Sequence, residues 1–361
     1  RYWWWCRSRP RPTRWCSRAP LATIPAQLPH DVPGFTGRTA ELRRIGDVVS
    51  GAQSRGEASV VVVTGGPGVG KTALAIHFAH RIARQFPDGQ LYLDLQGYAP
   101  HGRPTPPHEA LGSLLAAFRI RTEPPDGTLE RSALFRSHVA GRRLLVVLDN
   151  AASVEQVRPL LPGGSSSVVL VTGRTALTGL AVRDGARRIG LDVLQEEEAI
   201  SLFSRAVGHT FTAAQYPAVR KIVDACARLP LALRIAAARM HGTAPPNVAI
   251  AALAALGEEH LFDYLHVPGD ERATLRCVFD WSLRELPPDA AQLLQALGLA
   301  RESTFTLDDA AELSGADRRT VRRSLDTLVE ASLVDEPMPD HFRLHGLLLA
   351  YARRLLDAGL V

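Results

Sequence analysis

SVVVVTGGPGVGKT, residues 59–72, is the stretch of sequence that decides the fold. Its second half fits the pattern G-x-x-x-x-G-K-[ST], and its first half is a Val-rich run that predicts a buried strand. Glycines suit this loop because successive backbone N–H groups must curl around phosphate oxygens without obstruction by a Cβ atom. The amphipathic helix expected after it adds donors and partial positive charge at its N-terminus. The stretch therefore predicts a phosphate-binding loop.

The side chains of this loop have distinct predicted roles. Lys71 would reach the β and γ phosphates as a point charge, and Thr72 would offer its hydroxyl to Mg²⁺. Lysine occurs only twice in the chain, against forty arginines, so the composition does not explain the match. The nucleotide-binding residues predicted from the loop are Gly65, Gly66, Pro67, Gly68, Val69, Gly70, Lys71, Thr72 and Ala73.

Two further polar residues follow predicted strands. Asp149 ends the run LLVVLD and Arg174 follows SVVLVTG. In parallel α/β proteins both would lie at the carboxyl edge of the sheet, where ligands bind. We expect Asp149 to hold Mg²⁺ together with Thr72, and Arg174 to contact the γ-phosphate and sense its loss. Lys71, Asp149 and Arg174 are thus the candidate catalytic residues.

Strands and helices alternate through the first half of the chain. The expected helices cover residues 37–49, 71–85, 108–119 and 128–140, and the expected strands cover 59–65, 91–95, 144–149 and 167–173. Continuous Val/Leu strands separated by helices indicate a parallel sheet with helices on both faces. The predicted fold class is an α/β P-loop domain followed by an all-α helical subdomain and a winged helix.

The second half of the chain loses the strand pattern after about residue 192. Residues 195–256 read as a run of helices. The end of the chain has the element order of a winged helix. A capping-box-like start at Thr306–Asp309 begins a helix, and a Ser314-Gly315 turn leads to a second helix. Strand-like segments at 331–336 and 341–344 then precede a last helix. The predicted units are a disordered leader and linker (1–29), a P-loop domain (30–191), a helical subdomain (192–264) and a winged-helix subdomain (265–361).

Composition and charge narrow the classes of function. The chain has 361 residues with 46% hydrophobic content, typical of a folded protein, and no apolar run is long enough to span a membrane. Six arginines fall in the first twenty residues, so subtracting them from the net charge of +5 leaves −1 for the rest. The body is nearly neutral, and four scattered cysteines do not form a disulfide framework. We expect a cytoplasmic protein.

Two other classes of P-loop protein fit less well. Guanine-specific GTPases usually read their base with an N-K-x-D segment, which the chain lacks. ABC transporters place an L-S-G-G-Q-like signature before the Asp strand, whereas the similar stretch here, 161–165, comes after it. The nucleotide is therefore expected to be ATP or ADP.

Taken together, GGPGVGKT, LLVVLDN, VLVTGR and LPLAL resemble the NB-ARC module of the STAND signal-transduction ATPases. The segments PGFTGRTAEL (33–42), FPDGQLYLDLQGY (86–98) and FRLHGLLLAYA (342–352) are most similar to actinobacterial transcriptional regulators of the SARP type, which control secondary-metabolite genes. The resemblance covers residues 30–355. Family regulators usually carry an N-terminal DNA-binding region and tetratricopeptide repeats, for which this chain has no matching segment.

The resemblance implies further site residues. Phe35 and Arg38 would lie against the adenine, and Pro230 would touch it from the helical subdomain. His345 falls at the histidine of the family's M-H-D motif, which contacts the β-phosphate of ADP and locks the winged helix. From the residues alone, Pro230 would merely begin a helix and His345 would pack beneath the last helix.

Three positions depart from the family pattern. Asn150 stands where a second acid is common, so hydrolysis is expected to be slow at most. Gly346 replaces the Asp of M-H-D, and Arg228 replaces the glycine of G-L-P-L-A.

The favoured hypothesis is a molecular switch that ADP holds closed and ATP opens for self-assembly, with slow ATP hydrolysis at most. The alternative is a DNA-binding regulator that acts through Arg318, Arg319, Arg322 and Arg323 of the winged helix, although Asp317 and Asp326 dilute that charge and direct DNA contact is not expected from this chain. A nucleotide-binding fragment without signalling is the third reading.

Overall fold

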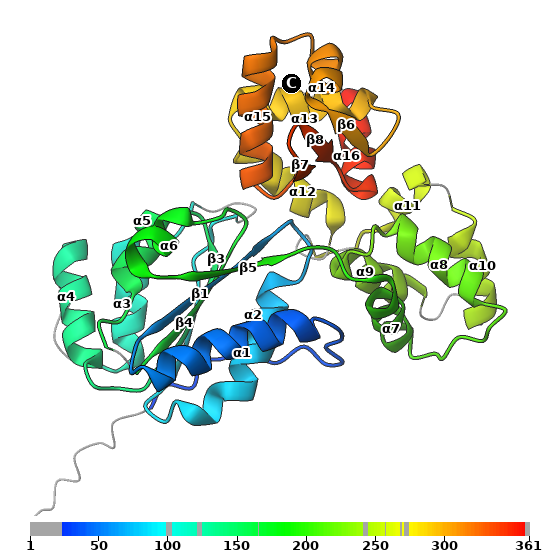
Figure 1. The fold of residues 1–361 in the computed structure, drawn as a ribbon. Helices are drawn as coiled ribbons and strands as arrows, with labels where there is room; N and C mark the ends of the chain where they lie inside the picture. The colour runs from blue at the N-terminus through cyan, green and yellow to red at the C-terminus, as the bar shows by residue number, and fades with distance from the viewer. Residues whose placement is uncertain are drawn as a thin grey trace, which may run out of the picture.

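The chain folds into three parts that meet around one end of a β-sheet. A computed structural model describes residues 24–357 except 99–102, 121–124, 165, 241–244, 257, 268 and 271–273. Figure 1 shows a sheet with its covering helices in blue to green, a group of helices in green to yellow, and a winged-helix part in orange and red. The predicted disordered leader lies outside the described residues up to residue 23.

The first part is an α/β unit. Its elements are α1 (Thr39–Ser54), β1 (Ser59–Gly65), α2 (Lys71–Ile82), η1 (Ala83–Gln85), β2 (Gln90–Asp94), α3 (Pro107–Ala117), α4 (Thr128–Val139), β3 (Leu145–Ala151), α5 (Val154–Val157), η2 (Arg158–Leu160), β4 (Val168–Gly173), α6 (Thr178–Asp184) and β5 (Arg187–Leu191).

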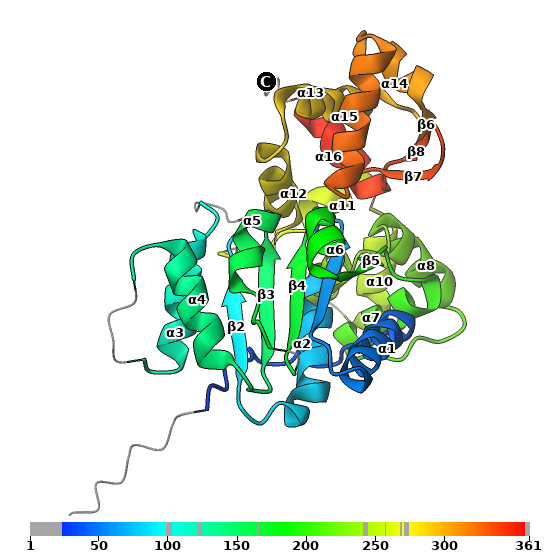
Figure 2. The same cartoon turned by 60° about the vertical axis from the view of Figure 1, so that its left-hand side comes forward.

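The five strands form one parallel sheet in the order β2-β3-β4-β1-β5. Successive residues of β1 face opposite sides: Val61 and Val63 belong to a buried cluster that includes α1 and α2, whereas Val60 and Val62 belong to a second cluster that includes residues of α3 to α6. Because both faces of the strand are buried, its sequence is an unbroken run of valines. The predicted fold class is confirmed, with helices on both faces of a parallel sheet (Figure 2).

One strand was not predicted. β5 pairs with β1 at the edge of the sheet, but its first two side chains, Arg187 and Arg188, are exposed. Only Ile189 and Leu191 of this strand are buried. Its place in the sheet therefore comes from backbone pairing with β1 rather than from an apolar run.

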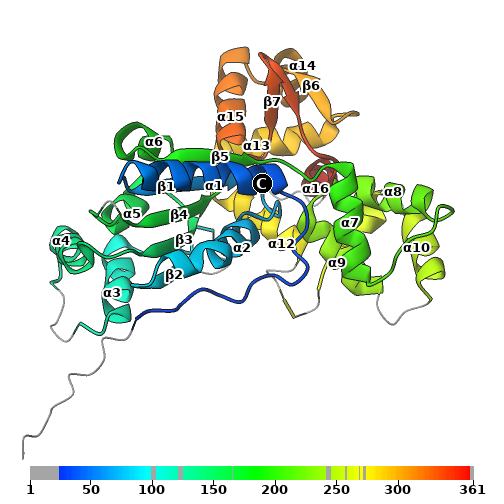
Figure 3. The same ribbon diagram turned by 60° about the horizontal axis from the view of Figure 1, so that its bottom comes forward.

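The segment before α1 lies in extended form across the sheet and α2. Gln27 N–H donates to Gln90 O of β2 at 2.9 Å, and Gln90 N–H donates to Pro25 O at 2.8 Å. Further along, Asp31 contacts His77 of α2 at 3.0 Å. Figure 3 shows this segment, in dark blue, running beside α2 toward α1. Pro25 and Gln27, in the segment 24–29 that was predicted to be disordered, are thus hydrogen-bonded to β2.

The second part is helical, as predicted, and follows β5 to one side of the sheet (Figure 1). It contains α7 (Glu196–Val207), α8 (Tyr216–Ala225), α9 (Pro230–Met240), α10 (Pro246–Ala254) and α11 (Glu258–Tyr264). Three glutamates occupy the first turn of α7, where the helix dipole favours acidic side chains.

The third part is the winged helix. Its elements are α12 (Leu275–Arg284), α13 (Pro288–Ala296), η4 (Leu297–Leu299), β6 (Thr304–Thr306), α14 (Leu307–Ser314), α15 (Arg318–Glu330), β7 (Asp335–Met338), β8 (His341–Arg343) and α16 (Gly346–Asp357). The capping box predicted at Thr306 and Asp309 is present. β6 was not predicted, and the first predicted wing strand, 331–336, begins four residues later than expected.

A single cluster of buried apolar side chains runs through all three parts. It includes Leu74 and Phe78 of α2, Phe203 of α7, and Phe279 and Leu348 of the winged helix. The three parts are therefore held together by continuous hydrophobic packing. No helix in the described part of the chain is long and apolar enough to cross a bilayer.

Candidate nucleotide site

The P-loop joins β1 to α2 in the conformation that its glycines require. Gly65, Gly68 and Gly70 have φ angles of 146°, 76° and 95°, which side chains with a Cβ rarely adopt. A Cβ at Gly65 would also collide with the Leu191 carbonyl oxygen. The loop therefore has the glycine-dependent backbone conformation in front of the N-terminus of α2 that binding of a phosphate by backbone N–H groups requires.

Lys71 folds back over this loop. Its Nζ donates to Gly65 O at 2.9 Å and to Gly66 O at 2.8 Å. Part of the residue is exposed, but burial of its amino group, helped by the positive charge of Arg174, lowers the pKa to about 7. The amino group is therefore only partly protonated near neutral pH, and an anion beside it would favour the protonated form.

Asp149 and Thr72 meet beside the loop. Thr72 Oγ1 donates to Asp149 Oδ1 at 2.8 Å, and Tyr92 OH donates to Asp149 Oδ2 at 3.0 Å. Burial raises the pKa of Asp149, although these hydroxyl donors and Thr172 act in the opposite direction. A hydroxyl and a carboxylate are hard oxygen donors, so the pair fits Mg²⁺ held partly by phosphate and water. Among the described residues no three-residue His/Cys/Asp/Glu cluster offers a separate metal site.

Both other parts of the molecule touch the P-loop. Leu231 N–H, in the first turn of α9, donates to Gly68 O at 3.2 Å, and a Cβ on Gly70 would lie 3.8 Å from Pro230 Cγ. Ser332, in the turn after α15, places its carbonyl oxygen 3.0 Å from where a Cβ on Gly66 would stand. The loop is thus enclosed by the helical part on one side and the winged helix on the other.

Arg174 contacts the winged helix. Its guanidinium donates to Val278 O at 3.3 Å and to Ser282 Oγ, both on α12, and lies 4.3 Å from the centre of the Tyr98 ring. Ser332 Oγ donates to Arg174 O at 2.9 Å. Burial lowers the pKa of Arg174 to about 10, so it stays charged at neutral pH. The residue predicted to sense a phosphate therefore joins β4 to α12 in this structure.

His345 lies at the N-terminus of α16 in a defined protonation state. Leu348 N–H donates to His345 Nδ1 at 3.1 Å, and the ring lies 5.7 Å from that of Phe279. Burial lowers the pKa of His345 to about 4, so it is neutral at physiological pH. Because Nδ1 accepts, the proton is on Nε2, which can donate to a ligand oxygen.

Phe35 and Arg38 lie near α2 and the P-loop. The Phe35 ring stacks on His77 with centroids 4.2 Å apart. Arg38 is buried, and its guanidinium donates to Val69 O at 3.1 Å and to Asp192 O at 2.6 Å. Arg38 therefore links the P-loop to the segment after β5, while Phe35 packs on α2.

A cavity of about 490 Å³ lies where the three parts meet. Its volume is within the usual range of small-molecule sites. The site residues that line it are Gly65, Gly66, Pro67, Val69 and His345, and the lining residues that sequence reasoning did not assign to the site include Asp192, Asp224, Arg228, Asp335 and Arg343. Phe35, Arg38, Lys71, Thr72, Ala73, Asp149, Arg174 and Pro230 are not among its lining residues.

A second hollow, about 660 Å³, lies between α1 and the start of β5. It is at the opposite end of the sheet from the P-loop and contains none of the predicted site residues. The smaller cavity, which P-loop residues and His345 line, is therefore the candidate nucleotide site.

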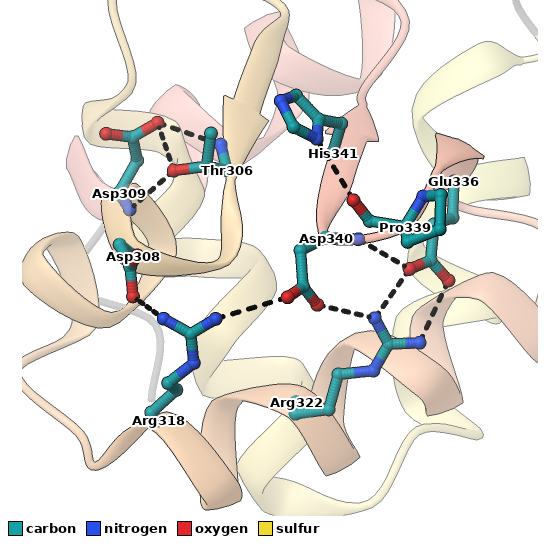
Figure 4. A network of polar contacts seen from close by, with 9 residues as sticks. All are labelled: Thr306, Asp308, Asp309, Arg318, Arg322, Glu336, Pro339, Asp340 and His341. Atoms are coloured by element: carbon teal, nitrogen blue, oxygen red, sulfur yellow. Dashed lines mark hydrogen bonds and ion pairs between the residues drawn. The ribbon is translucent and has the colours of Figure 1, made fainter.

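The charged face of the winged helix is occupied by internal ion pairs (Figure 4). Arg318 on α15 contacts Asp308 and, at 3.1 Å, Asp340. Arg322 contacts Glu336 at 2.9 Å and Asp340 at 3.2 Å. These contacts tie α15 to α14 and to the β7–β8 wing, so two of the four arginines proposed to bind DNA already have acidic partners.

Replacing Arg322 should weaken the winged helix measurably. We expect Arg322→Ala to lower the unfolding free energy by about 1 kcal/mol, because a partly exposed network is worth more than one surface pair but is screened by solvent. Differential scanning calorimetry should then show a Tm lower by roughly 2–4 °C. Exposed Arg319, on the same helix, is the control; an equal loss for Arg319→Ala would mean that the network contributes nothing specific.

Comparison with known proteins supports this description. A family model for a winged helix-turn-helix domain matches residues 286–357. The chain is 40% identical over 334 residues to regulatory protein AfsR of Streptomyces coelicolor, and 42% identical over 330 residues to regulatory protein AfsR of Streptomyces griseus. Each alignment covers 91% of this chain, which spans only 33% of the length of either relative.

Among solved structures, the Walker-type ATPase of Pyrococcus abyssi superposes with a TM-score of 0.59 at 13% identity, covering 89% of this chain and 96% of that chain. At that identity the match supports the fold alone. The resemblance to actinobacterial regulators drawn from the motifs is confirmed by the two Streptomyces relatives. This chain is a P-loop protein with the fold of a Walker-type ATPase and a winged helix, homologous to one third of the regulatory protein AfsR.

Proposed function

We propose that this chain is a switch controlled by adenine nucleotide, which ADP holds closed and which exchange for ATP opens. The observation that carries the proposal is the enclosure of the P-loop by both other parts. Leu231 of the helical part donates to Gly68 O, and Ser332 of the winged helix lies over Gly66. A ligand in this site would touch all three parts, so its identity can bias their arrangement.

The residues around the loop supply the required chemistry. Lys71 and the N-terminus of α2 would hold phosphate oxygens, and neutral His345 would donate from Nε2. Thr72 and Asp149 would hold Mg²⁺, which supplies charge neutralisation at the phosphates. Asn150 follows Asp149, so no adjacent carboxylate is present to act as a base. Turnover of ATP is therefore proposed to be slow.

The biological setting follows from the relatives. Both are named regulatory proteins, and we propose that this chain serves a cytoplasmic transcriptional regulator of secondary metabolism that self-assembles in its ATP-bound form. Direct DNA binding by α15 is the weaker candidate, because Arg318 and Arg322 are engaged by Asp308, Glu336 and Asp340.

The test is to identify the nucleotide that the protein retains. Purified chain is denatured and the released nucleotide is quantified by ion-exchange chromatography, with about one ADP per chain expected. Small-angle scattering then compares ADP-bound and ATP-analogue-bound protein, and a larger radius of gyration is expected with the analogue. A folded chain that binds neither nucleotide would contradict the proposal, and binding without a change of size would favour a non-signalling fragment.

The lowered pKa of Lys71 predicts that nucleotide binding takes up a proton. The nucleotide-free amino group has a pKa of about 7 and is mostly neutral at pH 8.5, while phosphate favours its charged form. Affinity for ADP should therefore fall by up to about tenfold per pH unit above roughly pH 7.5, where the phosphates are already ionised. Calorimetry in buffers of different ionisation enthalpy measures the uptake. Lys71→Arg, which does not titrate in this range, should bind without it.

A further inference from the structure

The hollow of about 660 Å³ between α1 and the start of β5 has no role in the proposed switch. Figure 3 shows α1 alongside β1 and β5, so a helix forms one wall and the edge of the sheet forms the other. Apolar residues of both walls, Val48 and Ala52 of α1 and Ile189 of β5, line it. Its volume and its partly apolar lining are those of a site for a small molecule.

Arginine side chains dominate the polar part of this lining. Arg44 of α1 and Arg187 and Arg188 of β5 are exposed there. In the part of the chain that the structure describes, no hydrogen bond or ion pair engages any of these three guanidinium groups. The fourth arginine of the lining, Arg55, is paired with Glu57 at 2.8 Å. The hollow therefore holds three positive charges that lack a protein partner.

These charges exceed the remaining negative charge of the lining. Asp47 is the other acidic residue there, so three unpaired arginines against one carboxylate leave an excess charge of +2. Arg187 is in register with Val61 of β1, whose side chain belongs to the cluster that also contains buried residues of α1. Because successive strand residues alternate, Arg187 lies on the face that α1 covers and Arg188 on the other. Arg44 and Arg187 are therefore the pair placed to hold one anion.

Ser59, the first residue of β1, adds a buried hydroxyl to the lining. Only 4% of the residue is exposed, and its Oγ has no hydrogen-bond partner among the described residues. Its side chain lies on the same face as Val61 and Val63, which α1 covers. A buried hydroxyl without a partner costs free energy, and native proteins usually satisfy such a group with water or a bound ion. The hydroxyl is thus a second, independent indication of a ligand in this hollow.

Protection of the sheet edge alone does not explain this set of residues. Charged residues on an edge strand do hinder its pairing with another chain, which accounts for Arg187 and Arg188. It does not account for Arg44, which is on a helix, or for Ser59, which is buried. A long nucleic acid needs an extended basic surface, whereas the positive excess here lies in one hollow of small-molecule size. A phosphate group fits, because a guanidinium can donate two parallel hydrogen bonds to its oxygens.

We propose that the hollow between α1 and β5 is a second anion site, which binds a phosphate group, either free or carried by a small organic molecule. Arg44 and Arg187 donate to the phosphate oxygens, Ser59 donates from its hydroxyl, and Arg188 adds positive charge from the edge of the sheet. The site is separate from the P-loop and does not depend on the nucleotide switch.

The experiment titrates inorganic pyrophosphate into the full chain without Mg²⁺, by isothermal calorimetry. The wild type should show two kinds of site, the P-loop and the hollow, and Lys71→Ala should retain only the second. Within Lys71→Ala, a further Arg44→Gln or Arg187→Gln should weaken binding about fivefold, because each removes one charge that is partly screened by solvent. Ser59→Ala should weaken binding about threefold without lowering the Tm, because this hydroxyl has no protein partner to lose.

Arg43→Gln is the matched control. Arg43 precedes Arg44 on α1 and is exposed, but it does not line the hollow, so its replacement should leave binding unchanged. Inorganic phosphate and glucose 6-phosphate, titrated in the same way, distinguish the two sources of the phosphate group. Tighter binding of glucose 6-phosphate, weakened by Arg44→Gln, would assign an organic phosphate, and equal binding would assign the free ion.

A folded Lys71→Ala chain that binds no pyrophosphate would overturn the proposal. An equal loss for Arg43→Gln and Arg44→Gln would also overturn it, since general charge attraction would then explain the binding. If Lys71→Ala does not fold, Arg44→Gln in the wild type decides, because it must weaken one of the two kinds of site. If the wild type and Lys71→Ala both show only the site that Arg44→Gln weakens, the nucleotide switch is wrong while the second anion site stands.

Discussion

Replacing Lys71 with alanine should remove nearly all retained nucleotide. We expect Lys71→Ala to bind ADP about a hundredfold more weakly, because a charge-assisted contact to phosphate is lost in a partly enclosed site. The amino group lies 2.8–2.9 Å from two carbonyl oxygens of the P-loop, so it is already held against the loop that would bind phosphate. Quantifying nucleotide released from purified protein should show less than about a tenth of the wild-type amount.

The chain offers a matched control in its other lysine. Lys221 is exposed on α8, and Lys221→Ala removes the same charge away from the P-loop. It should retain nucleotide at the wild-type level. Circular dichroism must show that Lys71→Ala is folded; a folded variant that keeps its ADP would mean that the P-loop is not the phosphate site.

Arg174→Ala should loosen the winged helix and speed the release of ADP. The substitution removes the contacts of Arg174 with Val278 O, Ser282 and Tyr98. Hydrogen bonds from a buried charge are worth about 1.5–3 kcal/mol each, so release should accelerate by at least about tenfold. Stopped-flow fluorescence of a labelled ADP measures this rate.

Two variants separate the contacts of Arg174. Tyr98→Phe keeps the aromatic ring and should release ADP at the wild-type rate, whereas Ser282→Ala should have a smaller effect than Arg174→Ala. Arg183→Ala, which removes an exposed arginine of α6, controls for charge. If Arg174→Ala releases ADP at the wild-type rate, then the contact with α12 does not hold the closed form.

The sheet could be predicted where its strands are buried on both faces. β1, β3 and β4 are unbroken apolar runs, and their burial explains why the pattern identified them. β5 could not be predicted because Arg187 and Arg188 point to solvent and only pairing with β1 defines the strand. The other edge strand, β2, was predicted from its LYLDL run, so the exposed arginines rather than the edge position hid β5.

The centre of the site was accessible from sequence, but its contacts between parts were not. The pairing of Thr72 with Asp149 follows from the topology, because parallel strands bring their carboxyl ends to one edge. The position of Arg174 depends on α12, more than a hundred residues away, and no local pattern encodes that contact. Arg228 was visible only as an unusual residue in a familiar segment, and its left-handed backbone conformation required the structure.

The continuous apolar cluster makes the packing between the three parts dependent on temperature. Side chains such as Phe279 and Leu348 share their packing with residues of α2 and α7, so separating the parts exposes apolar surface to water. Such exposure carries a positive heat-capacity change, and the hydrophobic contribution weakens on cooling. In the proposed switch, the balance between closed and separated forms should therefore depend on temperature, with cold expected to shift it in the same direction as loss of ADP.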